Sequence, residues 1–261
     1  TDNMIKSRRG DIMPRDYIQI EKNIAETGFF SEYLPPCFKL DSYTLSVPPP
    51  HNCDLIEPYC FTMSRYNEND ARRSIFIPEI GAYLVTRNYI KQEKILQELI
   101  EFSESVDMSF SPILNGDDEI VRHEQSYDTV STETEEIPSN YIDNIIEKII
   151  RSSGAKKILK LDISNCFSSF YMHMMPAILL GVDDTQVNFK KFESNPNDVS
   201  IDNKYCTYRK LDEVVRRQNL NRTNGLLTGP LYSKIISEAF LTRIDKELTT
   251  SRLKFSRYVD D

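Results

Sequence analysis

The sequence predicts a mixed α+β fold with a substantial hydrophobic core. The chain has 261 residues, of which 39% are hydrophobic and 28% charged, a composition typical of globular domains. Apolar residues recur at helical spacing in several stretches, and short runs of β-branched and aromatic residues end at Pro or at acidic residues. At this length, the pattern favours one large domain or two interleaved ones.

Helices are expected over Tyr17–Thr27, 89–105, 141–154 (after Ser139 and Asn140) and 230–248. Between them, stacked prolines predict an irregular arm up to residue 65. An acidic, Ser/Thr-rich stretch over 111–138 reads as a loop or insertion, and the polar stretch over 183–224 reads as loop and helix.

Strands are expected over 71–78, 157–163 and 253–259. In the second of these, alternation places the apolar residues on one side and Lys160 with Asp162 on the other. An acid at the end of an apolar strand has two explanations that stay open. It is either the N-cap of a helix or a carboxylate presented to a metal ion.

Composition argues against several classes of protein. No apolar run approaches the roughly 20 residues that a membrane span needs, and no apolar segment follows the N-terminal basic cluster, as a secretory signal would require. The five cysteines include no CxxC pair, and the spacing of His51, Cys53 and Cys60 does not match a zinc site. We therefore expect reduced thiols in a cytoplasmic protein without membrane contacts.

Charge is distributed unevenly along the chain. The net charge of −8, from 40 acids and 32 bases, argues by itself against nucleic-acid binding, which usually needs a basic surface. Residues 115–136 hold eight acids and one Arg, whereas residues 204–222 hold six bases and two acids. A basic strip over 204–222 is thus expected within an acidic total.

The acids that end the two later strands carry the chemical argument. Asp162 ends one strand, a helix opened by Gly-Pro follows, and Asp260 and Asp261 end the next. Adjacent carboxylates repel unless solvent or a cation separates them, and Mg²⁺ prefers carboxylate oxygens, water and phosphates. Two such ions would serve phosphoryl transfer. A pair of aspartates is common in turns, but this order of elements is more specific.

Three segments resemble motifs A, B and C of reverse transcriptases. They are LDISNCF (161–167, the motif A-like segment), GLLTGP with Ser233 (225–230, the motif B-like segment) and RYVDD (257–261, the motif C-like segment). The longer runs LDISNCFSSFYMHMMP and SRYVDD are similar to bacterial abortive-infection (Abi) and other defence-associated reverse transcriptases. The resemblance follows motif order over residues 28–261 and is strongest in 157–175 and 224–261.

The resemblance implies a right-hand polymerase fold, with fingers and an antiparallel palm sheet flanked by helices. Because the chain does not begin with Met and ends at YVDD without a cap or tail, we interpret it as a C-terminally truncated part of a longer protein. The implied parts are an N-terminal arm or extension (1–65), a fingers part (66–155), the palm with motif A (156–180), fingers or an insert (181–224) and the palm with motifs B and C (225–261).

The resemblance also implies site residues. Asp162, Asp260 and Asp261 would be the catalytic, metal-binding acids, and the Ile163 carbonyl would complete the coordination of Mg²⁺, or of Mn²⁺ in its place. The nucleotide-binding residues would be Arg72, Arg73, Phe167, Thr228 and Gly229.

Each nucleotide-binding assignment has a structural alternative. A ring at Phe167 would exclude a ribose 2′-hydroxyl and so favour deoxynucleotides, but Phe is also a common core residue. The guanidinium groups of Arg72 and Arg73 suit phosphates, but they also suit surface ion pairs. Thr228 and Gly229 would lie beside the nascent base pair, and they equally fit a plain turn into a helix.

The implied activity is Mg²⁺-dependent DNA synthesis from deoxynucleoside triphosphates, as in bacterial antiphage defence. Thr228 stands where the family usually has Gln, so RNA-directed and template-independent synthesis both stay open. Partners would be a DNA or RNA template or primer, or a protein hydroxyl as primer, and we expect an oligomer in the full-length protein. The alternatives are a retron- or intron-type reverse transcriptase of a mobile element, and a non-catalytic scaffold with the same fold.

Overall fold

A computed structural model describes residues 15–34, 37–49, 56–64, 72–114, 120–121 and 139–258. Asp260 and Asp261 lie outside these described residues, as do most of the acidic stretch over 111–138 and parts of the arm over 1–65. The elements, in chain order, are α1 (Tyr17–Thr27), α2 (Ser42–Ser46), β1 (Tyr59–Ser64), β2 (Arg72–Ile77), α3 (Ile80–Gln92), α4 (Ile95–Ser103), α5 (Ser139–Ser152), α6 (Cys166–Ser169), the 3₁₀ turn η1 (Met172–Met174), α7 (Ala177–Leu180), α8 (Val182–Ser194), α9 (Asn203–Arg217) and α10 (Leu231–Thr250).

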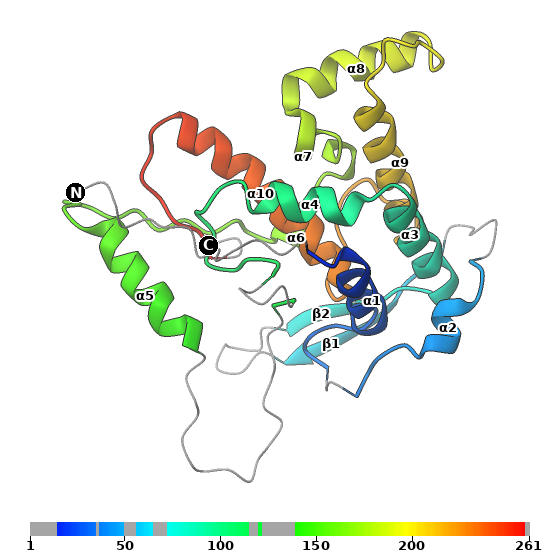
Figure 1. Cartoon of the computed structure of the whole chain (residues 1–261), viewed down its shortest axis with the longest axis horizontal. Coiled ribbons are helices and arrows are strands. Elements are labelled where there is room, and N and C mark those ends of the chain that lie inside the picture. Colours follow the sequence, from blue (N-terminus) through cyan, green and yellow to red (C-terminus); the bar gives the residue numbers. More distant parts are fainter. Residues whose placement is uncertain are drawn as a thin grey trace.

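The mixed α+β class is confirmed for the described part of the chain. Its sheet is the antiparallel pair β1–β2, in register from Tyr59 opposite Ile77 to Ser64 opposite Arg72. Helices make up most of the remainder, and α10 runs through their centre, packed against α4 and α7 (Figure 1). None of the helices in the described ranges has the length and apolar character of a membrane span.

Several local predictions are confirmed. Helix α1 begins after Asp16, whose carboxylate accepts hydrogen bonds from the amides of Ile18 and Gln19, both at 3.1 Å. Strand β2 ends just before Pro78, which has no amide hydrogen to continue a ladder. Helices α5 and α10 also form where the apolar spacing predicts them, although Pro230 is the N-cap of α10 rather than its first helical residue.

The single helix predicted over 89–105 is wrong. The chain forms α3 and α4 instead, separated at Glu93 and Lys94, and Lys94 takes a left-handed backbone conformation with φ of 55°. Since α4 is an independent helix, it can turn Ile95, Leu99 and Ile100 fully into the core.

The two strands predicted to carry the acids are also wrong within the described residues. Residues 157–163 are irregular and exposed, with Leu159 and Leu161 at 79% and 69% exposure. Residues 253–256 are irregular as well, and Arg257 forms one parallel bridge, with Ser109. Strand backbone needs a neighbouring strand to pair its N–H and C=O groups, and no described segment pairs with 157–163.

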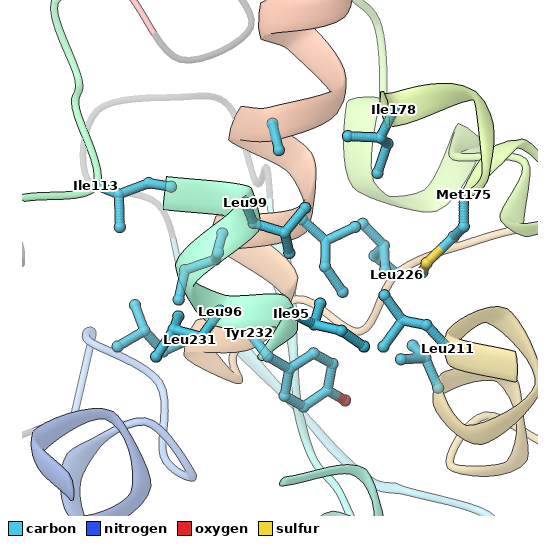
Figure 2. Close-up of a cluster of buried hydrophobic side chains, with 14 of the residues drawn as sticks. Ile95, Leu96, Leu99, Ile113, Met175, Ile178, Leu211, Leu226, Leu231 and Tyr232 are labelled. Carbon is cyan, nitrogen blue, oxygen red and sulfur yellow. The ribbon is translucent and has the colours of Figure 1, made fainter. Parts of the chain in front are cut away.

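The hydrophobic core lies where α4, α7, α9 and α10 meet. Figure 2 shows Leu96 and Leu99 of α4 close to Leu231 and Tyr232 of α10, with Leu211 of α9 closing one side. These side chains are all nearly inaccessible to solvent, and burial of each contributes about 1.5–3 kcal/mol to stability. The core thereby fixes α10 and the turn before it, from which the candidate site is built.

Candidate functional site

The motif B-like segment is bound to strand β2 at the start of α10. The amide of Phe76 donates a hydrogen bond of 2.7 Å to the carbonyl of Thr228. Gly229 follows with φ of 143°, and a Cβ atom there would lie 2.5 Å from the carbonyl oxygen of Phe76. Glycine is therefore required by both backbone conformation and close approach. The contact brings the strand that carries Arg72 and Arg73 next to Thr228 and Gly229.

The N-terminal arm contacts the same turn and orients Arg73. The carbonyl of Gly28 accepts a hydrogen bond of 2.8 Å from the amide of Leu231, the first residue of α10. The guanidinium of Arg73 lies over the ring of Tyr33, 5.0 Å from its centroid, and donates to its hydroxyl. Arg72 is exposed, whereas Arg73 is partly buried. Of the two predicted phosphate ligands, Arg73 is thus the one held in a defined orientation.

The last residue of the motif A-like segment, and a residue shortly after it, are hydrogen-bonded to the motif B-like segment. The carbonyl of Phe167 accepts from the amide of Leu226, and that of Phe170 accepts from the amide of Gly225, both at 2.8 Å. Phe167 is partly buried and packs against the hydrophobic core. Phe167 therefore packs as a core residue, which is the structural alternative. Its role under a sugar ring stays a prediction.

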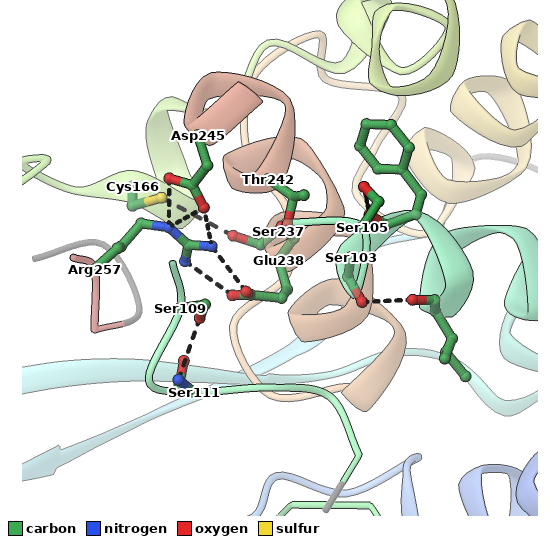
Figure 3. A network of polar contacts seen from close by, with 12 residues as sticks. Ser103, Ser105, Ser109, Ser111, Cys166, Ser237, Glu238, Thr242, Asp245 and Arg257 are labelled. Atoms are coloured by element: carbon green, nitrogen blue, oxygen red, sulfur yellow. Dashed lines mark hydrogen bonds and ion pairs between the residues drawn. The ribbon is translucent and has the colours of Figure 1, made fainter. Parts of the chain in front are cut away.

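The motif C-like segment begins at a buried arginine that is bound to α10. Arg257 donates from Nη1 and Nη2 to the two carboxylate oxygens of Glu238, at 2.9 and 2.8 Å (Figure 3). It also donates from Nε to both carboxylate oxygens of Asp245, at 3.2 and 3.1 Å, and from Nη2 to Oδ2 at 2.9 Å. All three side chains are buried.

This cluster perturbs the titration of its members. Burial raises the pKa of Asp245, with repulsion from Glu238 adding to the shift, whereas the hydrogen bonds from Arg257 oppose it. Burial lowers the pKa of Arg257, but its bonds to Glu238 and Asp245 outweigh burial, so that the pKa is raised overall. The guanidinium therefore stays charged.

Tyr258, the next residue, lies near the N-terminal arm. Burial raises the pKa of its hydroxyl, and the neighbouring Glu32 carboxylate and Tyr33 add to the shift. Since Tyr33 also contacts Arg73, the arm lies between the predicted phosphate ligand and the motif C-like segment.

The predicted metal ligands are only partly covered by the structure. Asp162 is exposed in the irregular stretch before α6, and Asp260 and Asp261 fall outside the described residues. Across the described ranges, no three His, Cys, Asp or Glu side chains are grouped so that they could hold a metal ion. Carboxylate oxygens are the donors that Mg²⁺ prefers, so the donor set suits the predicted ion, and the site itself stays a prediction.

The basic strip over 204–222 is largely paired within the protein. Its ion pairs and ring contact are Lys204 with Glu98, Lys210 and Arg217 with Glu213, Arg216 with Asp212, and Arg209 over the ring of Phe192. Side chains engaged in this way offer little uncompensated charge to a phosphate backbone. The strip therefore does not support a nucleic-acid interface on α9.

Sequence reasoning missed two polar clusters. His173 makes a 2.8 Å hydrogen bond through Nδ1 to Asp212, which also accepts from Nε of Arg216 at 2.7 Å. The other cluster is that of Arg257. The sequence contains a signal for this second cluster, because Glu238 and Asp245 are seven residues apart and share the buried face of α10. Buried acids without a partner are costly, so their position indicates a buried base.

No protein-family model matches the chain, and no curated protein matches it.

Proposed function

We propose that this chain supplies the catalytic acids of a nucleotidyltransferase that builds DNA from deoxynucleoside triphosphates, as reverse transcriptases of bacterial antiphage defence do. The proposal includes the right-hand fingers and palm arrangement. It also includes a cytoplasmic setting, where deoxynucleotides are available, and a nucleic-acid or protein primer.

One observation carries the proposal. Consecutive residues of α10 contact the motif A-like and the motif C-like segments. Ser237 Oγ lies 4.0 Å from Cys166 Sγ, and Glu238 binds Arg257 (Figure 3). Asp162 is four residues before Cys166, and Asp260 is three residues after Arg257. Extended chain covers at most about 14 Å in four residues and about 11 Å in three, so anchors on neighbouring residues allow the two carboxylates to meet.

The turn before α10 would form the nucleotide site. Thr228 and Gly229 adjoin the strand of Arg72 and Arg73, and guanidinium groups bind phosphate oxygens through paired hydrogen bonds. In the proposed reaction, Arg73 would hold the triphosphate, and positioning with charge stabilisation would supply most of the rate gain. Asp162, Asp260, Asp261 and the Ile163 carbonyl would hold Mg²⁺, or Mn²⁺ in its place, whose charge stabilises the transferred phosphoryl group.

The test is nucleotide incorporation by the purified full-length protein. It is incubated with each labelled deoxynucleotide and Mg²⁺ or Mn²⁺, with and without added RNA or DNA. We expect labelled product, and we expect Asp162→Asn to lower the rate by on the order of a hundredfold or more. Asp183→Asn, at an exposed acid in the first turn of α8, is the matched control and should keep the rate.

Product that disappears with proteinase would identify a protein primer, and product that depends on added RNA would identify templated synthesis. No incorporation by the wild-type protein under any of these conditions would contradict the proposal.

One observation favours a second candidate, the non-catalytic scaffold. Asp162 lies in an exposed and irregular stretch, which by itself gives no fixed ligand geometry. Phage protection separates the two functions: Asp260→Asn with Asp261→Asn abolishes protection by a polymerase and leaves protection by a scaffold unchanged.

A further inference from the structure

A small cavity lies where helix α1 of the N-terminal arm packs against the hydrophobic core. Its volume is about 30 Å³, and its walls come from α1, α3, α4 and α10. Most of the lining is apolar, including Leu96, Leu99 and the ring of Tyr232 (Figure 2). Two charged residues also line it, Glu21 of α1 and Arg87 of α3. The cavity is therefore apolar except where these two side chains meet it.

Each of the two charged side chains has an atom that lacks a hydrogen-bond partner. Among the side chains that the structure describes, three buried polar atoms have none: Glu21 Oε1, Arg87 Nε and Ser233 Oγ. Two of these three thus belong to residues that line one cavity. Glu21 Oε1 lies 3.4 Å from Arg87 Nη2, an ion-pair contact without hydrogen-bond geometry. Buried charged groups without hydrogen bonds are costly, so two such atoms at one cavity indicate a shared partner.

The other atoms of both side chains are already engaged. Glu21 Oε2 lies 3.2 Å from Lys91 Nζ, and Arg87 Nη1 donates to the carbonyl of Leu45 at 3.1 Å. These contacts attach α1 and α2 to α3 and hold the carboxylate and the guanidinium in place. Neither side chain can turn toward a different partner without losing a contact that it already makes.

The two atoms have opposite requirements. A carboxylate oxygen only accepts hydrogen bonds, whereas the Nε of a guanidinium only donates. A metal ion would bind Glu21 but repel Arg87, and an anion would do the reverse. A partner for both must accept one hydrogen bond and donate another. Water does both, and a cavity of about 30 Å³ has room for roughly one or two water molecules.

We propose that this cavity is a hydration site, in which an ordered water accepts from Nε of Arg87 and donates to Oε1 of Glu21. The water joins α1 to α3. Helix α1 leads into Gly28, whose carbonyl accepts a hydrogen bond of 2.8 Å from the amide of Leu231. The hydration site thereby stabilises the position of the arm against α10, and it is independent of the proposed function.

A high-resolution crystal structure of the wild-type protein tests the site directly. We expect density for a water within about 2.7–3.2 Å of both atoms. Crystals pressurised with xenon add a second readout, because dry apolar cavities bind xenon. The wild-type cavity should bind none. Xenon in the wild-type cavity, or a direct hydrogen bond between Glu21 Oε1 and Arg87 Nε with no water density, would overturn the proposal.

A double variant removes both partners of the water. Glu21→Met combined with Arg87→Met leaves neither charge of this pair without the other. We expect the water to be lost and xenon to bind in the cavity. Glu26→Met is the matched control, because Glu26 lies on the same helix and is not among the residues that line the cavity. Its crystals should keep the water and bind no xenon. A double variant that keeps the water would contradict the assigned partners.

Stability gives a measurement that needs no crystals. Ala25 lines the cavity and is 1% exposed, so the two carbons that Ala25→Val adds would displace the water. In the wild-type background, both charged atoms then lose their partner, and the folding equilibrium constant should fall by on the order of tenfold or more. In the double Met background, the same change fills apolar space, and the fall should be at least about fivefold smaller. Urea denaturation measures both. Equal falls would overturn the proposal, since crowding alone acts alike in the two backgrounds.

Discussion

The amide of Phe76 donates a 2.7 Å hydrogen bond to the carbonyl of Thr228, which joins strand β2 to the turn before α10. Two segments about 150 residues apart thereby share one backbone contact, and neither side chain takes part in it. Because the contact is made by backbone atoms, it depends on how closely the two segments approach each other. Gly229 sets that approach.

Gly229→Ala should destabilise the protein and separate β2 from the turn. An alanine Cβ at this position would lie 2.5 Å from the Phe76 carbonyl oxygen, and φ is 143°, so strain of roughly 1–3 kcal/mol adds to the steric overlap. Gly154→Ala is the matched control, because its φ is also positive, at 79°, yet nothing lies within 4 Å of the added atom. Urea denaturation should show the larger loss for Gly229→Ala. Equal losses in the two variants would refute the close-approach argument.

Local signals made part of this fold predictable from sequence. Helix α1 has a capping Asp16 and ends before Gly28, and both boundaries follow from short-range chemistry. Strand β2 is bounded by Pro78 in the same way. In each case the signal and the structure it specifies lie within one turn or one strand of each other.

The remaining features depend on contacts between residues far apart in the chain, and a single sequence does not reveal which residues make them. Apolar alternation over 157–163 is typical of a strand, but no described segment supplies the hydrogen bonds that a strand needs. The break at Lys94 was hidden because the apolar spacing continues on both sides of it. The contact between Arg257 and Glu238 links two residues 19 apart, and only the folded chain brings them together.

Asp245→Asn should change how stability depends on pH. Burial raises the pKa of Asp245 in the folded protein, whereas an unfolded Asp titrates near about 4. The folded state therefore holds this proton more tightly, and the contribution of Asp245 to the free energy of unfolding falls as pH rises from about 4 through the raised pKa. Asparagine cannot ionise, so the variant gains stability relative to wild type across that window, as urea denaturation at several pH values would measure.

Asp41→Asn provides a control of opposite sign. The backbone amide of Thr44 donates to Asp41 and lowers the pKa of its carboxyl, so its contribution is present above the unfolded value and lost as pH falls through the folded one. The free energy of unfolding of this variant, relative to wild type, should therefore be lower at neutral pH than in acid. The same trend for both variants would contradict the assignment of Asp245.

Asp212→Ala should be far more destabilising than His173→Ala. Asp212 is 3% exposed, and its loss would leave Nε of the largely buried Arg216 without its carboxylate partner, at a cost of about 3–5 kcal/mol. The His173 side chain is 42% exposed, and removal of such an exposed partner should cost about 1 kcal/mol or less. Chemical denaturation of both variants checks the difference. A loss for His173→Ala as large as that for Asp212→Ala would show that the imidazole carries the cluster.

Arg73→Ala should weaken nucleotide binding if the proposed function holds. Tyr33 orients the guanidinium of Arg73, on the strand that adjoins Thr228 and Gly229. Loss of a charged hydrogen bond of about 1.5–3 kcal/mol corresponds to a KM for deoxynucleotide that is about 10- to 100-fold higher. Arg209→Ala is the matched control, since Arg209 stacks on Phe192 in the same way, 4.0 Å from the ring centroid, but on α9. Steady-state incorporation kinetics provide the measurement. A KM that rises equally in both variants would mean that stacking stabilises the fold and that Arg73 holds no phosphate.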